Sequence, residues 1–78
     1  MERPDIEVDA RGLWCPLPVL RLARALSGKA VGSVARLSAT DPAVGEDVAV
    51  FCREGGHELV ESRRDADVFT FLVRKGPT

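Results

Sequence analysis

The chain has 78 residues, which is enough for one domain over residues 1–78 and too few to enclose a large cofactor beside a core. Its 11 basic and 12 acidic residues give a net charge of −1, which argues against a strongly nucleic-acid-binding domain. No apolar run approaches the roughly 18 residues of a membrane span. We therefore expect no bound cofactor, no direct nucleic-acid partner and no membrane segment.

The N-terminus and the cysteines indicate where the protein works. Met1-Glu2-Arg3-Pro4-Asp5 is polar and resembles neither a signal peptide nor a transit peptide. Cys15 and Cys52, with His57 as the one histidine, lack the close pairs of soft ligands that zinc requires. Nothing suggests secretion, so we expect a cytoplasmic protein with reduced thiols and no metal.

The first half of the chain predicts a strand, a helix and a second strand. Residues 5–10 alternate apolar and acidic side chains, which indicates a strand with one buried face, and Gly12 in the following connection is free to adopt a positive φ. A helix follows, with Pro16 at its first position and Ser27-Gly28 as its stop. Its apolar stripe has the helical spacing i, i+3, i+4 and i+7 and consists of Val19, Leu22, Ala23 and Leu26. Residues 33–40 alternate again and predict a strand parallel to the first.

The second half predicts another helix and a hairpin. Asp41 as N-cap and Pro42 at the first helical position begin the helix, and Gly55-Gly56 end it. The apolar stripe of this helix consists of Val44, Val48, Phe51 and Cys52. Residues 57–63 and 68–74 predict two antiparallel strands joined by the polar connection 64–67, and residues 75–78 form a tail.

The element order is therefore β-α-β-α-β-β. We expect an α+β fold, a two-layer sandwich in which two helices cover one face of a four-stranded mixed sheet. The other face would be polar, in keeping with Arg36 and Ser38.

Cys15 is the candidate catalytic residue, because a thiol before Pro-x-Pro at the start of a helix is a poor choice for packing alone. At the N-cap, the helix N-terminus would stabilise a thiolate, the reactive form. Pro18 lacks an N–H, so Leu17 alone could donate to the sulfur directly, and we expect a moderately acidic and still nucleophilic thiol. The alternative is a buried cysteine that acts as a small hydrophobe.

The residues around Cys15 would shape its site, and each has an alternative. Trp14 would anchor a partner or pack against the first helix as a hydrophobic staple. Arg11, with Arg21 and Arg24, would form a positive rim for an acidic partner or a solvated face. Asp41 would cap the second helix and would also lie at the sheet edge that carries Cys15.

No general base is evident, since His57 begins a distant strand. Without a base, Cys15 would act by sulfur exchange with a partner protein. Cys52 lies on an apolar stripe, so core packing is the expected role, and a resolving thiol for Cys15 is the alternative.

Several blocks of this sequence resemble the TusA-like sulfur-carrier family. The block Asp9-Ala10-Arg11-Gly12-Leu13-Trp14-Cys15-Pro16-Leu17-Pro18 is similar to the family's D-x-x-G-x-x-C-P-x-P signature. The further blocks are Thr40-Asp41-Pro42-Ala43, Phe51-Cys52 with His57-Glu58-Leu59, and Leu72-Val73-Arg74-Lys75-Gly76. Trp14 occupies a position that is often polar in the family.

The resemblance implies a sulfurtransferase in which Cys15 accepts sulfane sulfur as a persulfide. Gly12, Trp14, Pro16, Leu17 and Pro18 would shape the site, with Arg11 and Asp41 in support. A cysteine desulfurase or a rhodanese would donate the sulfur, and an acceptor protein would serve tRNA thiolation, molybdenum-cofactor supply or sulfur oxidation. We expect a monomer. The alternative functions are a thiol redox switch between Cys15 and Cys52, and a small RNA-binding or regulatory module.

Overall fold

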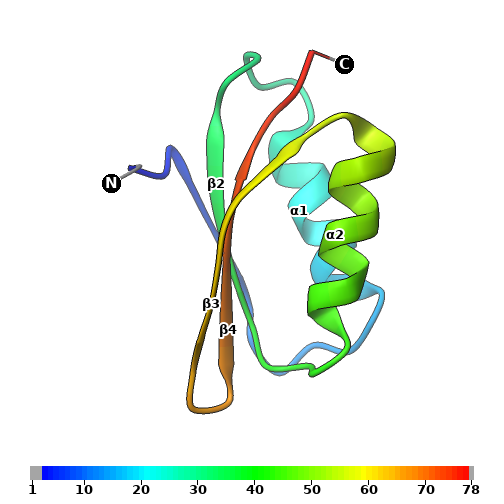
Figure 1. Ribbon diagram of the computed structural model, residues 1–78, viewed down its shortest axis with the longest axis vertical. Coiled ribbons are helices and arrows are strands. Elements are labelled where there is room, and N and C mark those ends of the chain that lie inside the picture. The colour runs from blue at the N-terminus through cyan, green and yellow to red at the C-terminus, as the bar shows by residue number, and fades with distance from the viewer. Residues whose placement is uncertain (1–2, 78) are drawn as a thin grey trace.

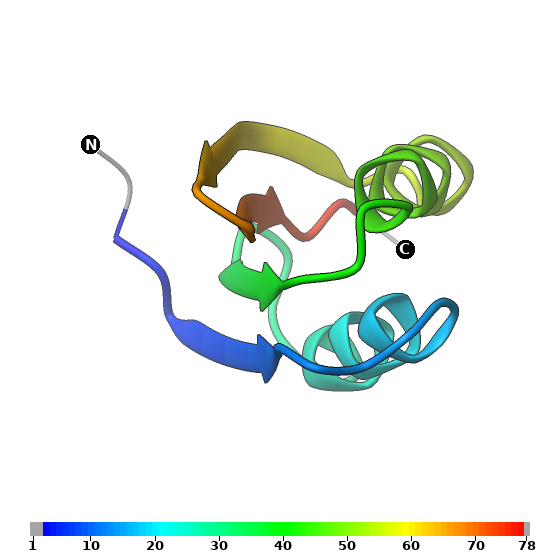
Figure 2. The ribbon, with the colours of Figure 1, turned by 90° about the horizontal axis from the view of Figure 1, so that it is seen from below.

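Two helices cover one face of a four-stranded sheet, and the opposite face is open (Figures 1 and 2). The computed structural model describes residues 3–77, so predictions that fall on Met1, Glu2 and Thr78 lie outside the described residues. In chain order the elements are β1 (Ile6–Ala10), α1 (Leu17–Leu26), β2 (Val34–Ala39), α2 (Val44–Gly55), β3 (Glu58–Asp65) and β4 (Val68–Arg74). The predicted α+β sandwich and its element order are confirmed.

The sheet has the strand order β1-β2-β4-β3. β1 and β2 are parallel, with Val8 opposite Leu37, whereas β4 is antiparallel to both of its neighbours. The first two strands are parallel because α1 carries the chain back across the sheet between them. The mixed sheet and its C-terminal hairpin are as predicted.

The core lies between the helices and the sheet. The α2 stripe is as predicted and includes Val48 and Cys52, whereas α1 contributes Leu22 and Leu26 of its predicted stripe and packs Ala25, not Ala23, against the core. Opposite them, β2 and β4 contribute side chains that are almost fully buried, such as Leu37 and Val73. The buried position of Cys52 agrees with its predicted packing role.

The hairpin differs from the prediction in length. β3 runs through Asp65, so the turn consists of Ala66 and Asp67 alone, and the predicted connection 64–67 was too long. Ala66 has φ +57°, in the left-handed region that a tight two-residue turn requires. A bulge between Leu59 and Glu61 interrupts the period-two pattern, which explains why the sequence signal for this strand was weak.

Both helices start at one end of the molecule. β1 and β2 are parallel, so the loops that leave their carboxyl ends, residues 11–16 and 40–43, lie together at the bottom of Figure 1. The first of these loops carries Cys15 and the second carries Asp41. Parallel pairing therefore brings the two candidate residues to one edge of the sheet.

Candidate functional site

Two hydrogen bonds join the loop that carries Cys15 to the loop that precedes α2. The backbone N–H of Gly12 donates to Oγ1 of Thr40 at 2.9 Å, and the backbone N–H of Cys15 donates to Oδ2 of Asp41 at 2.7 Å. Gly12 has φ +83°, as the sequence predicted, and this turn directs its N–H toward the second loop. The backbone of Cys15 is thus fixed against the start of α2.

The thiol of Cys15 is exposed and donates a hydrogen bond to a carboxylate. Its Sγ lies 2.5 Å from Oδ2 of Asp47, in the first turn of α2. This hydrogen bond is the largest of the effects that raise the pKa of Cys15 above its ordinary value, followed by partial desolvation and by the negative charges of Asp47 and Asp41. All of these effects favour the thiol over the thiolate.

The prediction that Cys15 occupies the N-cap of the first helix is therefore wrong. α1 begins at Leu17 with Pro16 as its N-cap, so Cys15 lies one residue further out than expected. The N–H of Leu17 donates to the carbonyl of Trp14 at 2.9 Å, which leaves the sulfur without that donor. The hydrogen bond to Asp47, with the charges of Asp47 and Asp41, raises the pKa of the thiol, whereas the sequence had predicted a lowered pKa.

Asp41 is buried, with 6% of its surface exposed, and serves both loops. Its Oδ1 accepts the N–H of Ala43 at 3.0 Å, while Oδ2 holds Cys15. The prediction that Asp41 is the N-cap of α2 was wrong by two residues, because Pro42 and Ala43 form a turn and Ala43 is the N-cap. At the candidate site, Asp41 fixes the backbone of Cys15 through this hydrogen bond.

The apolar neighbours of Cys15 divide between core and surface. Pro18 is buried, whereas Trp14 and Leu17 are 69% and 47% exposed. Trp14 therefore does not pack as a staple against α1. Leu20, one turn beyond Leu17, is 56% exposed, so Cys15 is followed along the chain by exposed apolar side chains at the start of α1.

The predicted positive rim does not lie at the sulfur. Arg11 forms an ion pair with Asp9, with Nε 3.0 Å from Oδ1. Arg21 acts on the same carboxylate and, with Arg24, lines a shallow hollow between α1 and β1. The charges that act on Cys15 are carboxylates instead.

The other two chemically active side chains lie away from Cys15. His57 follows the C-terminal end of α2, where its Nδ1 accepts the N–H of Gly76 at 2.9 Å and its ring stacks on Phe51. Burial and the charge of Lys75 lower the pKa of His57. Cys52 is in the core, and burial raises the pKa of its thiol.

Asp47 is the site residue that sequence reasoning missed. We had expected no base near Cys15, and the structure places this carboxylate against the sulfur. The available signal was positional: Asp47 lies in the first turn of the helix after the second parallel strand, at the sheet edge to which Asp41 had been assigned. An acidic residue in the first turn of a helix is usually explained by its favourable interaction with the helix dipole. That explanation gave no reason to expect a contact between Asp47 and Cys15.

With this geometry established, the chain can be compared with known proteins. Residues 6–75 match the family model described as Sulfurtransferase TusA. The sulfur carrier protein TusA of Allochromatium vinosum is 42% identical over 71 residues, covering 91% of this chain and 93% of that protein. The putative sulfur carrier protein YrkI of Bacillus subtilis is 32% identical, with 95% and 99% covered.

A solved structure agrees with these relatives. The crystal structure of a SirA-like protein from Desulfitobacterium hafniense superposes with a TM-score of 0.78 at 25% identity, covering 92% of this chain and 99% of that one. Within residues 3–77, neither helix has the length and apolar character needed to cross a membrane. On the agreement of fold, sequence and the Cys-Pro-x-Pro block, the chain belongs to the TusA family of sulfurtransferases, whose role is sulfur transfer.

Proposed function

We propose that the protein carries sulfane sulfur as a persulfide on Cys15 between a donor protein and an acceptor protein. The observation that carries this proposal is the exposed thiol of Cys15, whose backbone is fixed by a buried carboxylate at the edge of the sheet. An exposed sulfur in a segment with exposed apolar side chains such as Trp14 and Leu17 suits contact with another protein.

Loading and delivery are two thiol–persulfide exchanges. In loading, the sulfur of Cys15 attacks the terminal sulfur of a donor persulfide, R–S–SH. A new S–S bond forms on Cys15, the donor's S–S bond breaks, and R–S⁻ leaves with the electron pair and takes up the proton from Cys15. In delivery an acceptor thiolate attacks the terminal sulfur of the Cys15 persulfide in the same way, and Cys15 returns to the thiol. Neither step consumes an external oxidant or reductant.

The direct test is mass spectrometry of the protein after incubation with a cysteine desulfurase and cysteine. We expect one added sulfur, removed by dithiothreitol and located on the peptide that contains Cys15. Cys15→Ser should carry none, whereas Cys52→Ala should still be loaded, because its thiol lies in the core. An equal adduct on Cys15→Ser, or none on the wild type, would remove the proposal.

The partners follow from the same chemistry. A donor of the desulfurase or rhodanese class presents a cysteine persulfide, and the acceptor presents a thiol that serves tRNA thiolation, molybdenum-cofactor supply or sulfur oxidation. Mixed disulfides trapped on Cys15 in a lysate of the source cell, and absent with Cys15→Ser, would identify the pathway.

The geometry disfavours a redox switch between the two cysteines. Cys15 contacts Asp47, and Cys52 lies five residues later in α2, which is about 7.5 Å further along the helix axis at 1.5 Å per residue. Cys52 also faces the core, with 4% of its surface exposed. A disulfide would require the end of α2 to unwind or turn outward.

A further inference from the structure

Sulfur exchange by itself does not require the carboxylate that contacts the thiol. We propose, building on the persulfide role given to Cys15 above, that Asp47 holds the proton on Cys15 while the carrier is free and thereby sets the pH range in which the sulfur reacts. Asp47 is a catalytic residue in the sense that it contacts the reacting atom, and its effect in the free protein is to restrain that atom.

The position of Asp47 explains why the proton stays on the sulfur. Its Oδ2 accepts the S–H of Cys15 at 2.5 Å. Asp47 lies in the first turn of α2, where a negatively charged side chain interacts favourably with the partial positive charge of the helix N-terminus. A carboxylate stabilised in this way accepts a hydrogen bond from the thiol and repels the thiolate.

The other charged groups near Cys15 reinforce this effect. Asp41, from the loop before α2, adds a second negative charge, although both of its oxygens are occupied by backbone N–H groups. The first turn of α1, residues 17–20, contains no charged side chain, and Arg11 in the loop of Cys15 is paired with Asp9. Among the described residues, the charges that act on the sulfur are those of Asp47 and Asp41, and both favour the thiol.

Keeping the proton on the sulfur of Cys15 would protect a sulfur carrier from side reactions. The thiolate is the form that reacts with oxidants, alkylating agents and unintended disulfides. The thiol of Cys15 is exposed, so burial does not protect it. Retention of the proton by Asp47 would limit these side reactions until a docked partner changes the surroundings of the carboxylate.

The test is the rate of alkylation of Cys15 by iodoacetamide from pH 6 to 10, with Cys15→Ser as the blank for Cys52. The wild type should titrate above the ordinary thiol range. Asp47→Asn, which keeps the shape and removes the charge, should move the midpoint to lower pH. Each unit of that shift gives about tenfold more thiolate near pH 7, offset by lower nucleophilicity, for a net rate gain of about threefold.

Two matched variants separate this role from a general effect of charge. Glu46→Gln removes the neighbouring exposed carboxylate from the same helical turn and should leave the midpoint unchanged. Asp47→Glu restores a carboxylate and should return the midpoint toward that of the wild type. A purely structural role for Asp47 would not reproduce this pattern.

The outcomes distinguish this inference from the proposed function. A wild-type midpoint at or below the ordinary thiol range overturns the inference without any variant, as does an unchanged midpoint in a folded Asp47→Asn. Loading with glutathione persulfide is measured on the same samples. A shifted midpoint without a sulfur adduct would support the role of Asp47 and refute the carrier function, and an adduct with an unshifted midpoint would do the reverse.

Discussion

At the scale of single residues, two carboxylates contact different parts of Cys15. Asp41 holds the backbone of Cys15, and Asp47 holds its sulfur. Because Asp41 accepts N–H donors on both oxygens and is buried, its loss would leave two backbone groups without their partners.

We expect Asp41→Ala to lower the free energy of unfolding by about 2–4 kcal/mol, since hydrogen bonds to a buried charged group contribute about 1.5–3 kcal/mol each before relaxation. Asp41→Asn should also be destabilising, because its NH₂ group must face one of the two N–H donors. Urea denaturation measures both. Thr40→Ala, which removes the neighbouring hydrogen bond to Gly12, should cost less. An Asp41→Asn protein as stable as the wild type would contradict this account.

The sequence was sufficient to predict the positive φ of Gly12 and the sheet edge of Asp41, and it proposed Cys15 as the reacting residue. It could not establish the charge environment of the sulfur. Whether Cys15 is at the N-cap or one residue before it depends on the geometry of the Pro16 turn, and one residue decides whether the sulfur faces N–H groups or the carboxylate of Asp47. Long-range contacts of this kind leave no periodic signal.

At the scale of elements, apolar periodicity predicted which segments form helices and strands, and it failed where the backbone departs from regular geometry. The bulge near Glu61 and the two-residue turn at Ala66 shifted the expected limits of β3. The predicted tail provides a further case. Lys75 donates its N–H to the carbonyl of Ser33 at 2.8 Å and Gly76 donates to His57, so the segment after β4 is tied to the fold.

Gly76 allows the C-terminal segment to pack in this way because its backbone closely approaches the backbone of Gly56. A Cβ on Gly76 would lie 1.7 Å from the carbonyl oxygen of Gly56, the C-cap of α2. Gly76→Ala should therefore displace the C-terminal segment, break the contact with His57 and lower stability by about 1–3 kcal/mol, as overpacking typically does. Thermal unfolding measures the loss.

Gly45 offers the matched control for that substitution. Its added Cβ would meet the ring of Phe71 at 3.8 Å, an ordinary contact, and the residue lies inside α2. Gly45→Ala should raise stability by up to about 1 kcal/mol through helix propensity. Equal effects of the two substitutions would show that the close approach at Gly76 is unimportant.

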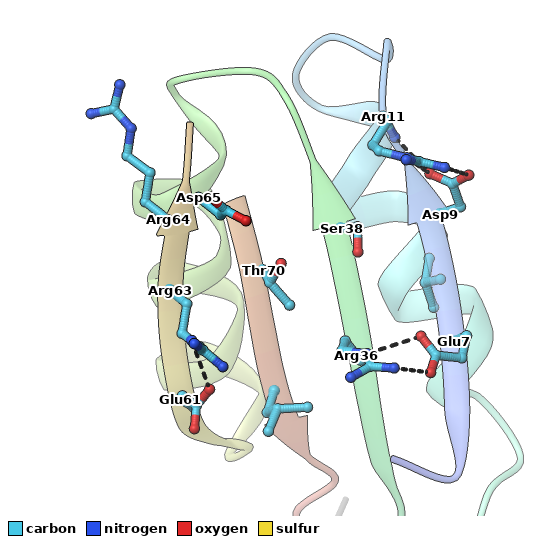
Figure 3. A pocket seen from close by; sticks show the side chains of 12 residues that line it. Glu7, Asp9, Arg11, Arg36, Ser38, Glu61, Arg63, Arg64, Asp65 and Thr70 are labelled. Carbon is cyan, nitrogen blue, oxygen red and sulfur yellow. Dashed lines mark hydrogen bonds and ion pairs between the residues drawn. The ribbon is translucent and has the colours of Figure 1, made fainter. Parts of the chain in front are cut away.

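At the scale of the whole molecule, the two faces differ in chemistry. The open face of the sheet is a broad polar hollow whose charges are largely paired with one another: Arg36 with Glu7, Arg63 with Glu61 and Arg11 with Asp9 (Figure 3). Paired charges of both signs present no basic stripe for a phosphate backbone, which argues against the RNA-binding alternative. Three exposed apolar side chains, Trp14, Leu17 and Leu20, lie instead in the loop of Cys15 and at the start of α1.

Trp14 should therefore matter to partners and little to the isolated protein. We expect Trp14→Ala to retain its thermal stability and its loading by glutathione persulfide, and to be loaded about tenfold more slowly by a protein donor, since exposed tryptophans often anchor interfaces. Val31→Ala is the control, because Val31 is 64% exposed and follows the far end of α1. Slower loading by the small molecule as well would indicate that Trp14 acts on the thiol itself.

The hydrogen bonds that define the site join residues 26, 28 and 32 positions apart in the chain. Such contacts form only after β1 and β2 have paired, so no local fragment around Cys15 would reproduce the behaviour of its sulfur. In the unfolded chain the thiol has its ordinary pKa, and folding raises it. Folding and protonation are therefore linked: this contribution to stability is present below the ordinary thiol range and fades as pH rises through the folded pKa. A newly made chain would expose a more reactive cysteine than the finished protein does.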